Sequence, residues 1–242
     1  MMLIKEEGPN AAGNKLYTFM DQTTVEVPER YKVQGVIGRG AYGMVCSAVD
    51  LLNGEQLAIK RVGRLFSDAV DGKRVLREVK ALGFLHHRNV LALKDVFFNG
   101  RPESFTELYI VTELMETDLR KMLDSPRLRM GAGHCQYFTL QLLCALQYVH
   151  SAHLIHRDLK PANLLTFSDC NLKLCDFGLA GGGQAEKEMT QYVVTRPYRP
   201  PELLLVKKKN ETTVDLWGVG CIAAESFPKR LHTPNKLTQQ YK

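Results

Sequence analysis

The sequence lacks a long apolar run. No stretch approaches the roughly 20 consecutive apolar residues that a membrane-spanning helix requires. The amino-terminal residues, MMLIKEEGPN, contain no apolar core of the kind found in secretory leaders. We therefore expect a soluble intracellular protein that does not associate with membranes.

The sequence also has little excess charge and no basic stripe. It contains 32 Lys and Arg residues against 26 Asp and Glu, and the cations are spread along the chain. The only run, Lys207-Lys208-Lys209, is typical of a solvated loop. Because nucleic-acid binding favours a basic stripe interleaved with aromatic side chains, we expect no nucleic-acid partner.

The six cysteines lack the spacing of metal ligands. Most of them lie among apolar neighbours, as in MVCSAV and LQLLCAL. This pattern is typical of buried free thiols in a reducing compartment.

The periodic segments divide the chain into two parts. Strand-like runs occupy residues 31–38, 42–50, 55–62, 89–98 and 108–114, and helical patterns occupy residues 70–85, 134–153 and 214–227. We predict an α+β fold with a strand-rich lobe over residues 31–113 and a helical lobe over residues 114–225. An N-terminal extension, residues 1–30, is poorly periodic and is expected to be a tail that becomes ordered near VEVPERYKV. A divergent tail, residues 226–242, ends the chain.

The helix predicted at residues 214–227 is apolar on almost every side. A helix of this kind is expected to be buried all round.

The sequence GRGAYGMV carries Gly38, Gly40 and Gly43 in the pattern Gly-x-Gly-x-x-Gly after a strand. Glycines allow a backbone to approach phosphate groups closely. An ordinary hairpin turn would explain the pattern equally well. The dinucleotide-binding alternative requires a helix directly after Gly43, whereas strand, turn and strand follow.

Lys60 ends the strand LAIK, where a lysine is most often exposed to solvent. Glu78 lies in the next helix on the side of Val75, Val79 and Leu82. A Lys60–Glu78 pair would hold the ammonium group where the phosphates of a nucleotide could bind.

Two further motifs, HRDLKPANLL and CDFGLA, bring together the groups that phosphoryl transfer requires. Asp158 would orient the attacking hydroxyl, Lys160 would lie near the transferred group, and Asn163 and Asp176 would bind Mg²⁺. Their order, behind a glycine loop and a strand lysine, makes a chance match improbable.

With these motifs the chain resembles a eukaryotic protein kinase over residues 31–225. The lysine two residues after Asp158 is typical of the serine/threonine type. The sequences VEVPERY, GAYGMVCSA, LMETDL and TQY followed by VVTR and YRPPE resemble the mitogen-activated protein kinase (MAP kinase) family. The resemblance implies a bilobal kinase fold and transfer of the ATP γ-phosphoryl group, with Mg²⁺, to protein Ser or Thr.

The resemblance also implies a nucleotide site. Glu113 to Met115 would form the hinge that meets adenine, Thr112 would be the gatekeeper, and Asp118 would lie near the ribose. The glycine loop would comprise Ile37, Gly38, Arg39, Gly40, Ala41, Tyr42 and Gly43, with Lys60 on the phosphates. Val45, Ala58 and Leu165 would enclose the adenine ring.

By the same resemblance, Thr190 and Tyr192 are regulatory phosphosites. Arg74 and Arg157 would receive phosphothreonine, and Arg196 and Arg199 would receive phosphotyrosine. Thr195 would hydrogen-bond near Asp158 and Lys160. We expect activation by an upstream dual-specificity MAP kinase kinase, protein substrates with Ser-Pro or Thr-Pro sites, a monomer, and a location in the cytoplasm and nucleus.

The chain departs from the family pattern at three places. Gly181-Gly182-Gly183 stands where relatives commonly have an arginine, and Pro197 stands where they commonly have tryptophan. Asp215 and Trp217 match the helix that anchors the helical lobe, but the resemblance stops after Glu225. We therefore expect a carboxy-terminally truncated kinase, with one side of that helix facing water. The alternative is a non-catalytic fragment that binds nucleotide or partners without turnover.

Overall fold

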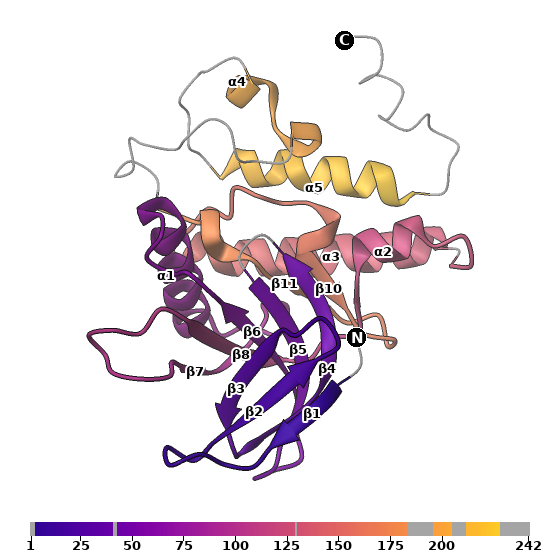
Figure 1. The fold of residues 1–242 in the computed structure, drawn as a ribbon. Helices are drawn as coiled ribbons and strands as arrows, with labels where there is room; N and C mark the ends of the chain where they lie inside the picture. Colours follow the sequence, from indigo (N-terminus) through magenta and orange to yellow (C-terminus); the bar gives the residue numbers. More distant parts are fainter. Residues whose placement is uncertain (1–2, 41–42, 129, 183–195, 205–211, 228–242) are drawn as a thin grey trace. The chain divides into compact units, whose positions relative to one another are not determined.

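The computed structural model describes residues 3–40, 43–128, 130–182, 196–204 and 212–227. The chain forms two compact units, one comprising Met1–Val79 and Ala92–Leu114, the other Lys80–Leu91 and Met115–Lys242. The first unit is rich in strands and the second in helices (Figure 1). This is the α+β composition of the kinase fold that the sequence predicts.

The first unit begins with a three-stranded antiparallel sheet. Its strands are β1 (Leu3–Glu7), β2 (Asn14–Phe19) and β3 (Thr24–Pro28), in the order β1-β2-β3. Tyr17 and Phe19 on β2 and Val25 and Val27 on β3 are buried, with the period of two that a strand imposes. The expectation of a tail is therefore wrong for β1 and β2, because short alternating pairs supply a buried face without a long apolar run, whereas β3 falls where order was expected to begin.

A five-stranded antiparallel sheet follows, with the order β4-β5-β6-β8-β7. Its strands are β4 (Tyr31–Gly40), β5 (Gly43–Asp50), β6 (Gln56–Val62), β7 (Leu93–Phe97) and β8 (Leu108–Glu113). These bounds agree with the strands predicted from the sequence to within a few residues.

The two faces of this sheet carry different side chains. Residues of one face, including Met44, Cys46 and Ile59, share a core with the buried side chains of β2 and β3. Because paired residues point to the same side of a sheet, the pairs Val45–Lys60 and Ala58–Thr112 place these four residues on the opposite face. The N-terminal sheet thus covers one face, and the other face carries the residues predicted to bind nucleotide.

Helix α1 (Ala69–Phe84) supports that second face. Val75 belongs to a buried cluster with Val62, Leu65 and Ile110, and Val79 packs against this cluster. Glu78 lies one helical turn from Val75, and its side chain is correspondingly turned inward and buried.

Gly43 begins β5 at a point where no side chain fits. Its φ is 153°, and a Cβ atom would lie 1.8 Å from the carbonyl oxygen of Arg61 on the paired strand. We expect Gly43→Ala to separate β5 from β6 locally and to cost about 1–3 kcal/mol of unfolding free energy, as residues forced into a strained backbone do. Urea unfolding measures this loss, and Gly40→Ala is the matched control because a Cβ at Gly40 meets nothing within 4 Å. Equal stability of the two variants would contradict the prediction.

The second unit is built from helices and one small sheet. Its helices are α2 (Leu119–Asp124), α3 (Ala132–Ser151), α4 (Pro201–Leu204) and α5 (Thr213–Ser226), and its strands are β9 (Thr117–Asp118), β10 (Leu164–Thr166) and β11 (Leu172–Leu174). Three short 3₁₀ helices are η1 (Pro161–Asn163), η2 (Phe177–Leu179) and η3 (Arg196–Tyr198). On α3 the predicted apolar face is confirmed, because Phe138, Leu142, Leu146 and Val149 are buried.

Helix α5 lies alongside α3 (Figure 1) and is buried on one side only. Val214, Val219 and Ile222 are buried, whereas Leu216 and Trp217 are 49% and 47% exposed. The expectation of a helix buried all round is therefore wrong, since its neighbours cover one side of the cylinder. The second expectation, that one side faces water, is confirmed among the described residues.

All six cysteines are free, as predicted, but only Cys46 and Cys135 are buried and the others are partly exposed. None of the helices in the described part of the chain combines the length and hydropathy needed to cross a bilayer.

Candidate active site

Lys60 and Glu78 form an ion pair within the first unit. The Lys60 Nζ atom lies 2.8 and 2.7 Å from the two carboxylate oxygens of Glu78. The Glu78 side chain is 11% exposed and that of Lys60 is 30% exposed. The ammonium group is therefore held by α1 and is not the freely solvated end of a strand lysine.

The glycine loop connects β4 to β5 near this pair. Gly38 pairs with Val45 and Gly40 with Gly43, so the loop closes as an antiparallel hairpin, while Ala41 and Tyr42 lie outside the described residues. The Arg39 guanidinium forms an ion pair with Asp21, in the turn between β2 and β3. The N-terminal sheet therefore contacts the loop directly.

Most of the remaining predicted nucleotide residues occupy strand positions. Ile37 is exposed on β4, and Thr112 is buried on β8 with its hydroxyl 3.3 Å from the Glu113 carbonyl oxygen. In the second unit, Asp118 pairs with Leu165 across β9 and β10. Asp118 also caps α2, because its carboxylate accepts a hydrogen bond of 2.9 Å from the Lys121 N–H. Met115 lies two residues after the end of β8, and the longer segment of the second unit, Met115–Lys242, begins with it.

The loop between α3 and β10 brings three predicted residues together. The Asp158 carboxylate accepts hydrogen bonds from Lys160 Nζ at 2.5 Å and from Asn163 Nδ2 at 3.3 Å. The Asn163 amide also donates to the Asp158 carbonyl oxygen at 2.9 Å. Asp158 and Asn163 are buried, so these contacts fix the direction in which the carboxylate points.

A second carboxylate, Asp215 on α5, anchors the backbone of this loop. Its Oδ2 atom accepts from the His156 N–H and its Oδ1 atom from the Arg157 N–H, both at 2.8 Å. His150 Nε2 lies 2.8 Å from Oδ2. Burial raises the pKa of Asp215, but the hydrogen bonds from His150 and the two backbone groups, with the nearby His156 ring, outweigh it and hold that pKa below its ordinary value.

One unusual backbone conformation and one close approach to α5 give the loop its shape. Arg157 has a φ of 68°, in the left-handed region that side chains other than glycine seldom adopt. The Arg157 N–H is the group that Asp215 binds, so the anchor stabilises this conformation directly. A close approach of Leu159 to α5 is possible because Gly218 lacks a side chain, since a Cβ there would lie 2.8 Å from the Leu159 Cβ.

His156 links this loop to the segment that carries Asp176. Its Nδ1 atom accepts from the Asp158 N–H at 3.3 Å, so Nε2 carries the proton that is donated to the Cys175 carbonyl oxygen at 2.9 Å. The ring also packs edge-on against Phe177, with 5.0 Å between ring centroids. Asp176 is the residue between Cys175 and Phe177, and its backbone is in the left-handed region, with a φ of 64°.

Asn163 and Asp176 are suited to holding a magnesium ion. The Cys175 N–H donates to the Asn163 carbonyl oxygen at 3.0 Å, which brings the two segments together. Because the Asn163 amide nitrogen is engaged by Asp158, its side-chain oxygen remains as an acceptor. Among the described residues no three His, Cys, Asp or Glu side chains gather as a complete metal centre. Mg²⁺ typically takes one or two protein oxygens together with phosphate oxygens and water, so this donor set fits it.

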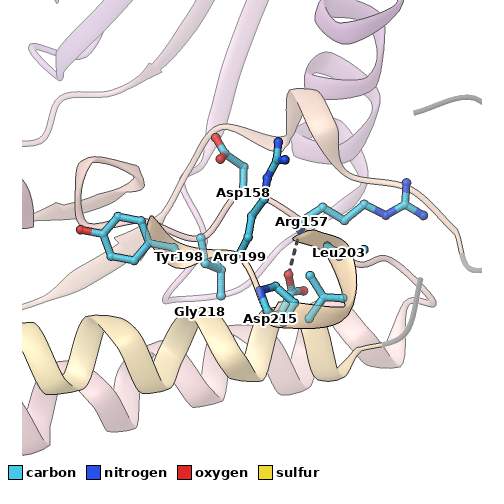
Figure 2. Close-up of a pocket in the computed structure, with 10 residues that line it drawn as sticks. Arg157, Asp158, Tyr198, Arg199, Leu203, Asp215 and Gly218 are labelled. Atoms are coloured by element: carbon cyan, nitrogen blue, oxygen red, sulfur yellow. Dashed lines mark hydrogen bonds between the residues drawn. The ribbon is translucent and has the colours of Figure 1, made fainter. Parts of the chain in front are cut away.

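A small pocket lies beside the loop and is lined by Arg157, Asp158, Tyr198, Arg199 and Asp215 among others (Figure 2). Arg157 and Arg199, which the sequence predicts to receive different phosphates, both line this pocket. The Arg157 side chain extends away from Asp158 (Figure 2) and donates to the Gly182 carbonyl oxygen at 3.3 Å. Arg74, in the first unit, forms an ion pair with Asp71 at 3.1 Å.

Several predicted residues fall on segments that the structure does not describe. Thr190, Tyr192 and Thr195 lie outside the described residues, and only the backbone of Arg196 is described, in η3.

Sequence reasoning missed two groups that position the site. The first is His150, whose only signal is its place in the last turn of α3, just before the loop. The second is a network in which Arg120 binds Asp124 and Glu225 while the Tyr198 hydroxyl donates to Glu225 at 2.6 Å. This network joins α2, α5 and η3. Arg120 and Asp124 have the i, i+4 spacing of a helix, but no local pattern reveals the contacts of Glu225 with Arg120 and Tyr198.

Comparison with known proteins agrees with this geometry. The protein kinase domain family matches residues 31–242, so the likeness extends further than the motifs indicate. The chain is 48% identical to mitogen-activated protein kinase 3 of Oryza sativa subsp. japonica over 232 residues, which are 95% of this chain and 62% of that protein. It is 49% identical to mitogen-activated protein kinase 2 of Arabidopsis thaliana over 225 residues, which are 92% of this chain and 60% of that protein. The chain thus spans about three fifths of the length of these relatives. It belongs to the protein kinase family, within the mitogen-activated protein kinases.

Proposed function

We propose that this chain is a serine/threonine protein kinase that transfers the γ-phosphoryl group of ATP to protein hydroxyl groups. The observation that carries the proposal is the Asp158 carboxylate, buried yet bound by Lys160 and Asn163 and anchored through the backbone to Asp215. Catalysis of phosphoryl transfer consists mainly of positioning and electrostatic stabilisation, which a fixed carboxylate beside a lysine supplies.

In this mechanism Asp158 accepts a hydrogen bond from the Ser or Thr hydroxyl of the substrate and receives its proton as the oxygen attacks the γ-phosphorus. The bond between that phosphorus and the β–γ bridging oxygen breaks, and ADP leaves. The carboxylate cannot rotate freely, because Lys160 and Asn163 both donate to its Oδ2 atom. Its second oxygen, Oδ1, would then accept the hydrogen bond from the substrate hydroxyl. Lys160, 2.5 Å from Asp158, places a positive charge beside the group that is transferred.

Asn163 and Asp176 would hold Mg²⁺ through side-chain oxygens, as their donor chemistry allows. When bound, the ion neutralises negative charge on the phosphates as the transfer proceeds. The left-handed backbone of Asp176 and the contact between Phe177 and His156 keep this carboxylate at a fixed place in the second unit.

Residues of the first unit would contact ATP. Lys60, held by Glu78, would contact the phosphates, and the glycine loop would cover them with backbone N–H groups. Val45 and Ala58 lie on the same sheet face as Lys60, where an adenine ring could pack on them. Thr112 has a small side chain, so we expect space behind the adenine position.

We further propose regulation by dual phosphorylation of Thr190 and Tyr192 by an upstream MAP kinase kinase. Each phosphate adds about −1.5 to −2 charges and three acceptor oxygens. In the second unit Arg157 would receive phosphothreonine and Arg199 phosphotyrosine, through charge-assisted hydrogen bonds. The TQY sequence and the two MAP kinase relatives support substrates in which proline follows the phosphorylated residue.

The proposal is tested by phosphoryl transfer from radiolabelled ATP to a Ser-Pro peptide, after treatment of the chain with a dual-specificity MAP kinase kinase. We expect Lys60→Met to lower kcat/KM by about 100- to 1000-fold, as the loss of one charge-stabilising group does. Lys73→Met, at an exposed position of the same α1 helix, is the matched control and should retain activity. If the wild-type chain is folded and phosphorylated but as inactive as Lys60→Met, the non-catalytic alternative replaces this proposal.

A further inference from the structure

The end of β4 that carries Arg39 is held by the five-stranded sheet on one side only. β4 is the edge strand in the order β4-β5-β6-β8-β7, so its backbone pairs with β5 alone. The register of this pairing shifts at two places along β4. Beyond the second shift, Arg39 stands between Gly38 and Gly40, which have no side chains to pack. The sheet by itself therefore gives this part of the glycine loop little support.

The Arg39 side chain points away from the sheet face that is predicted to bind nucleotide. Arg39 pairs with Met44 across β4 and β5, and paired residues point to the same side of a sheet. Met44 is buried in the core that includes the N-terminal sheet, whereas Val45 and Lys60 lie on the opposite face. The guanidinium thus reaches the N-terminal sheet, and the phosphate side is left to the backbone of the loop.

Asp21, in the turn between β2 and β3, receives this guanidinium. One carboxylate oxygen, Oδ1, accepts a hydrogen bond of 3.2 Å from the Thr23 N–H, and the other, Oδ2, accepts from Arg39. The guanidinium also donates to the Thr23 hydroxyl at 3.3 Å. Because each oxygen of the carboxylate has a partner, the turn itself sets the direction in which Asp21 meets Arg39.

The turn that carries Asp21 is fixed by contacts that do not involve Arg39. The Phe19 N–H donates to the Thr23 carbonyl oxygen at 2.9 Å, which closes the turn. Phe19, before the turn, and Val25, after it, are buried in the core that the N-terminal sheet shares with the five-stranded sheet. The acceptor for Arg39 therefore has a defined place in the first unit.

We propose that the Asp21–Arg39 pair is a positioning contact, which holds the glycine loop where its backbone meets the phosphates of ATP. This inference rests on the proposed function, because it requires that the chain bind ATP. Gly38 and Gly40 lie on either side of Arg39 in the chain, so holding Arg39 also holds the backbone that would cover the phosphates. The N-terminal sheet then contributes to nucleotide binding, although it carries none of the residues predicted to contact ATP.

The exposure of the pair limits the size of its effect. The side chains of Arg39 and Asp21 are 47% and 36% exposed. Because an exposed ion pair changes an equilibrium constant by about fivefold at most, we expect Asp21→Asn to raise the Kd for a nucleotide about two- to fivefold. The asparagine oxygen can still accept from the Thr23 N–H, so the substitution removes only the charge that Arg39 meets. Isothermal titration calorimetry with Mg²⁺ and a non-hydrolysable ATP analogue measures this Kd.

Two comparisons assign the change in Kd to this contact. In an Arg39→Gln background, the further substitution Asp21→Asn should leave the Kd unchanged, because the pair is already broken. Glu6→Gln is the matched control, since it removes the 3.0 Å ion pair with Lys15 inside the same N-terminal sheet. This control should bind the analogue as the wild type does. An equal rise in Kd for Asp21→Asn in both backgrounds would overturn the proposal.

Hydrogen exchange without nucleotide gives a second readout that does not depend on ATP binding. The amides of Arg39 and Gly40 should exchange severalfold faster in Asp21→Asn than in the wild type or Glu6→Gln. If the wild type binds the analogue and Asp21→Asn binds it equally well, this inference is overturned and the proposed function stands, whatever the exchange rates. If the wild type does not bind the analogue, the proposed function fails and this inference fails with it.

Discussion

Replacing Asp158 with asparagine should lower the turnover of phosphoryl transfer by about 100- to 10,000-fold, the range that general-base catalysis contributes. The amide has nearly the shape of the carboxylate, so it can still accept the hydrogen bond from Lys160. It cannot take a proton from the substrate hydroxyl at neutral pH. The loss should therefore appear in kcat, because the groups that would bind ATP are unchanged.

The measurement compares kcat and the affinity for Mg²⁺–ATP in the wild type and in Asp158→Asn. Asp169→Asn is the matched control, since Asp169 is an exposed aspartate in the turn between β10 and β11 of the same unit. We expect the control to match the wild type in both quantities. A similar kcat for Asp158→Asn and the wild type would show that Asp158 is not the base, and an equal loss in the control would point to a general destabilisation.

Side chains within one local motif were predictable because their spacing determines their contacts. Asp158, Lys160 and Asn163 lie within six positions of one another, and the structure joins them by hydrogen bonds. Glu78 was placed by its helical phase relative to Val75, and it meets Lys60 as the sequence predicts. In the second case the periodic element α1 leaves few directions in which a side chain can point.

The contacts missed from the sequence join distant segments. His150 and Asp215 are far apart in the chain and meet because α3 and α5 pack side by side. No periodicity specifies which polar residue of one helix faces which residue of another. The N-terminal sheet was missed for a different reason, because Tyr17 and Phe19 form too short an alternation to exceed the polar background.

Replacing Asp215 with asparagine should disrupt the loop that carries Asp158, although Asp215 touches no reacting group. Its two oxygens accept three hydrogen bonds, from His156 N–H, Arg157 N–H and His150. An asparagine has one acceptor oxygen, and its amide nitrogen would face a backbone donor. Leaving one buried N–H without an acceptor costs about 1–3 kcal/mol. For a chain of this size each kcal/mol lowers Tm by about 2–4 °C.

The pH dependence of this difference follows from the lowered pKa of Asp215. A carboxylate with a pKa below its unfolded value stabilises the fold above that unfolded value, and the contribution is lost as the pH falls through the folded pKa. The gap in Tm between wild type and Asp215→Asn should therefore be full at neutral pH and narrow in acid. A gap of constant size across the acid range would contradict the assignment of an ionised Asp215.

His150→Gln separates the backbone anchor from the side-chain contact. This substitution changes only the side chain that contacts Asp215 Oδ2. The two oxygens of Asp215 therefore continue to accept hydrogen bonds from the His156 and Arg157 N–H groups. We expect a smaller fall in Tm than for Asp215→Asn and little change in kcat, because Arg157 keeps the hydrogen bond that stabilises its left-handed backbone. If His150→Gln instead reduces kcat as strongly as Asp215→Asn, the loop is held chiefly by the contact between the two side chains. The backbone anchor would then be the weaker of the two constraints on Asp158.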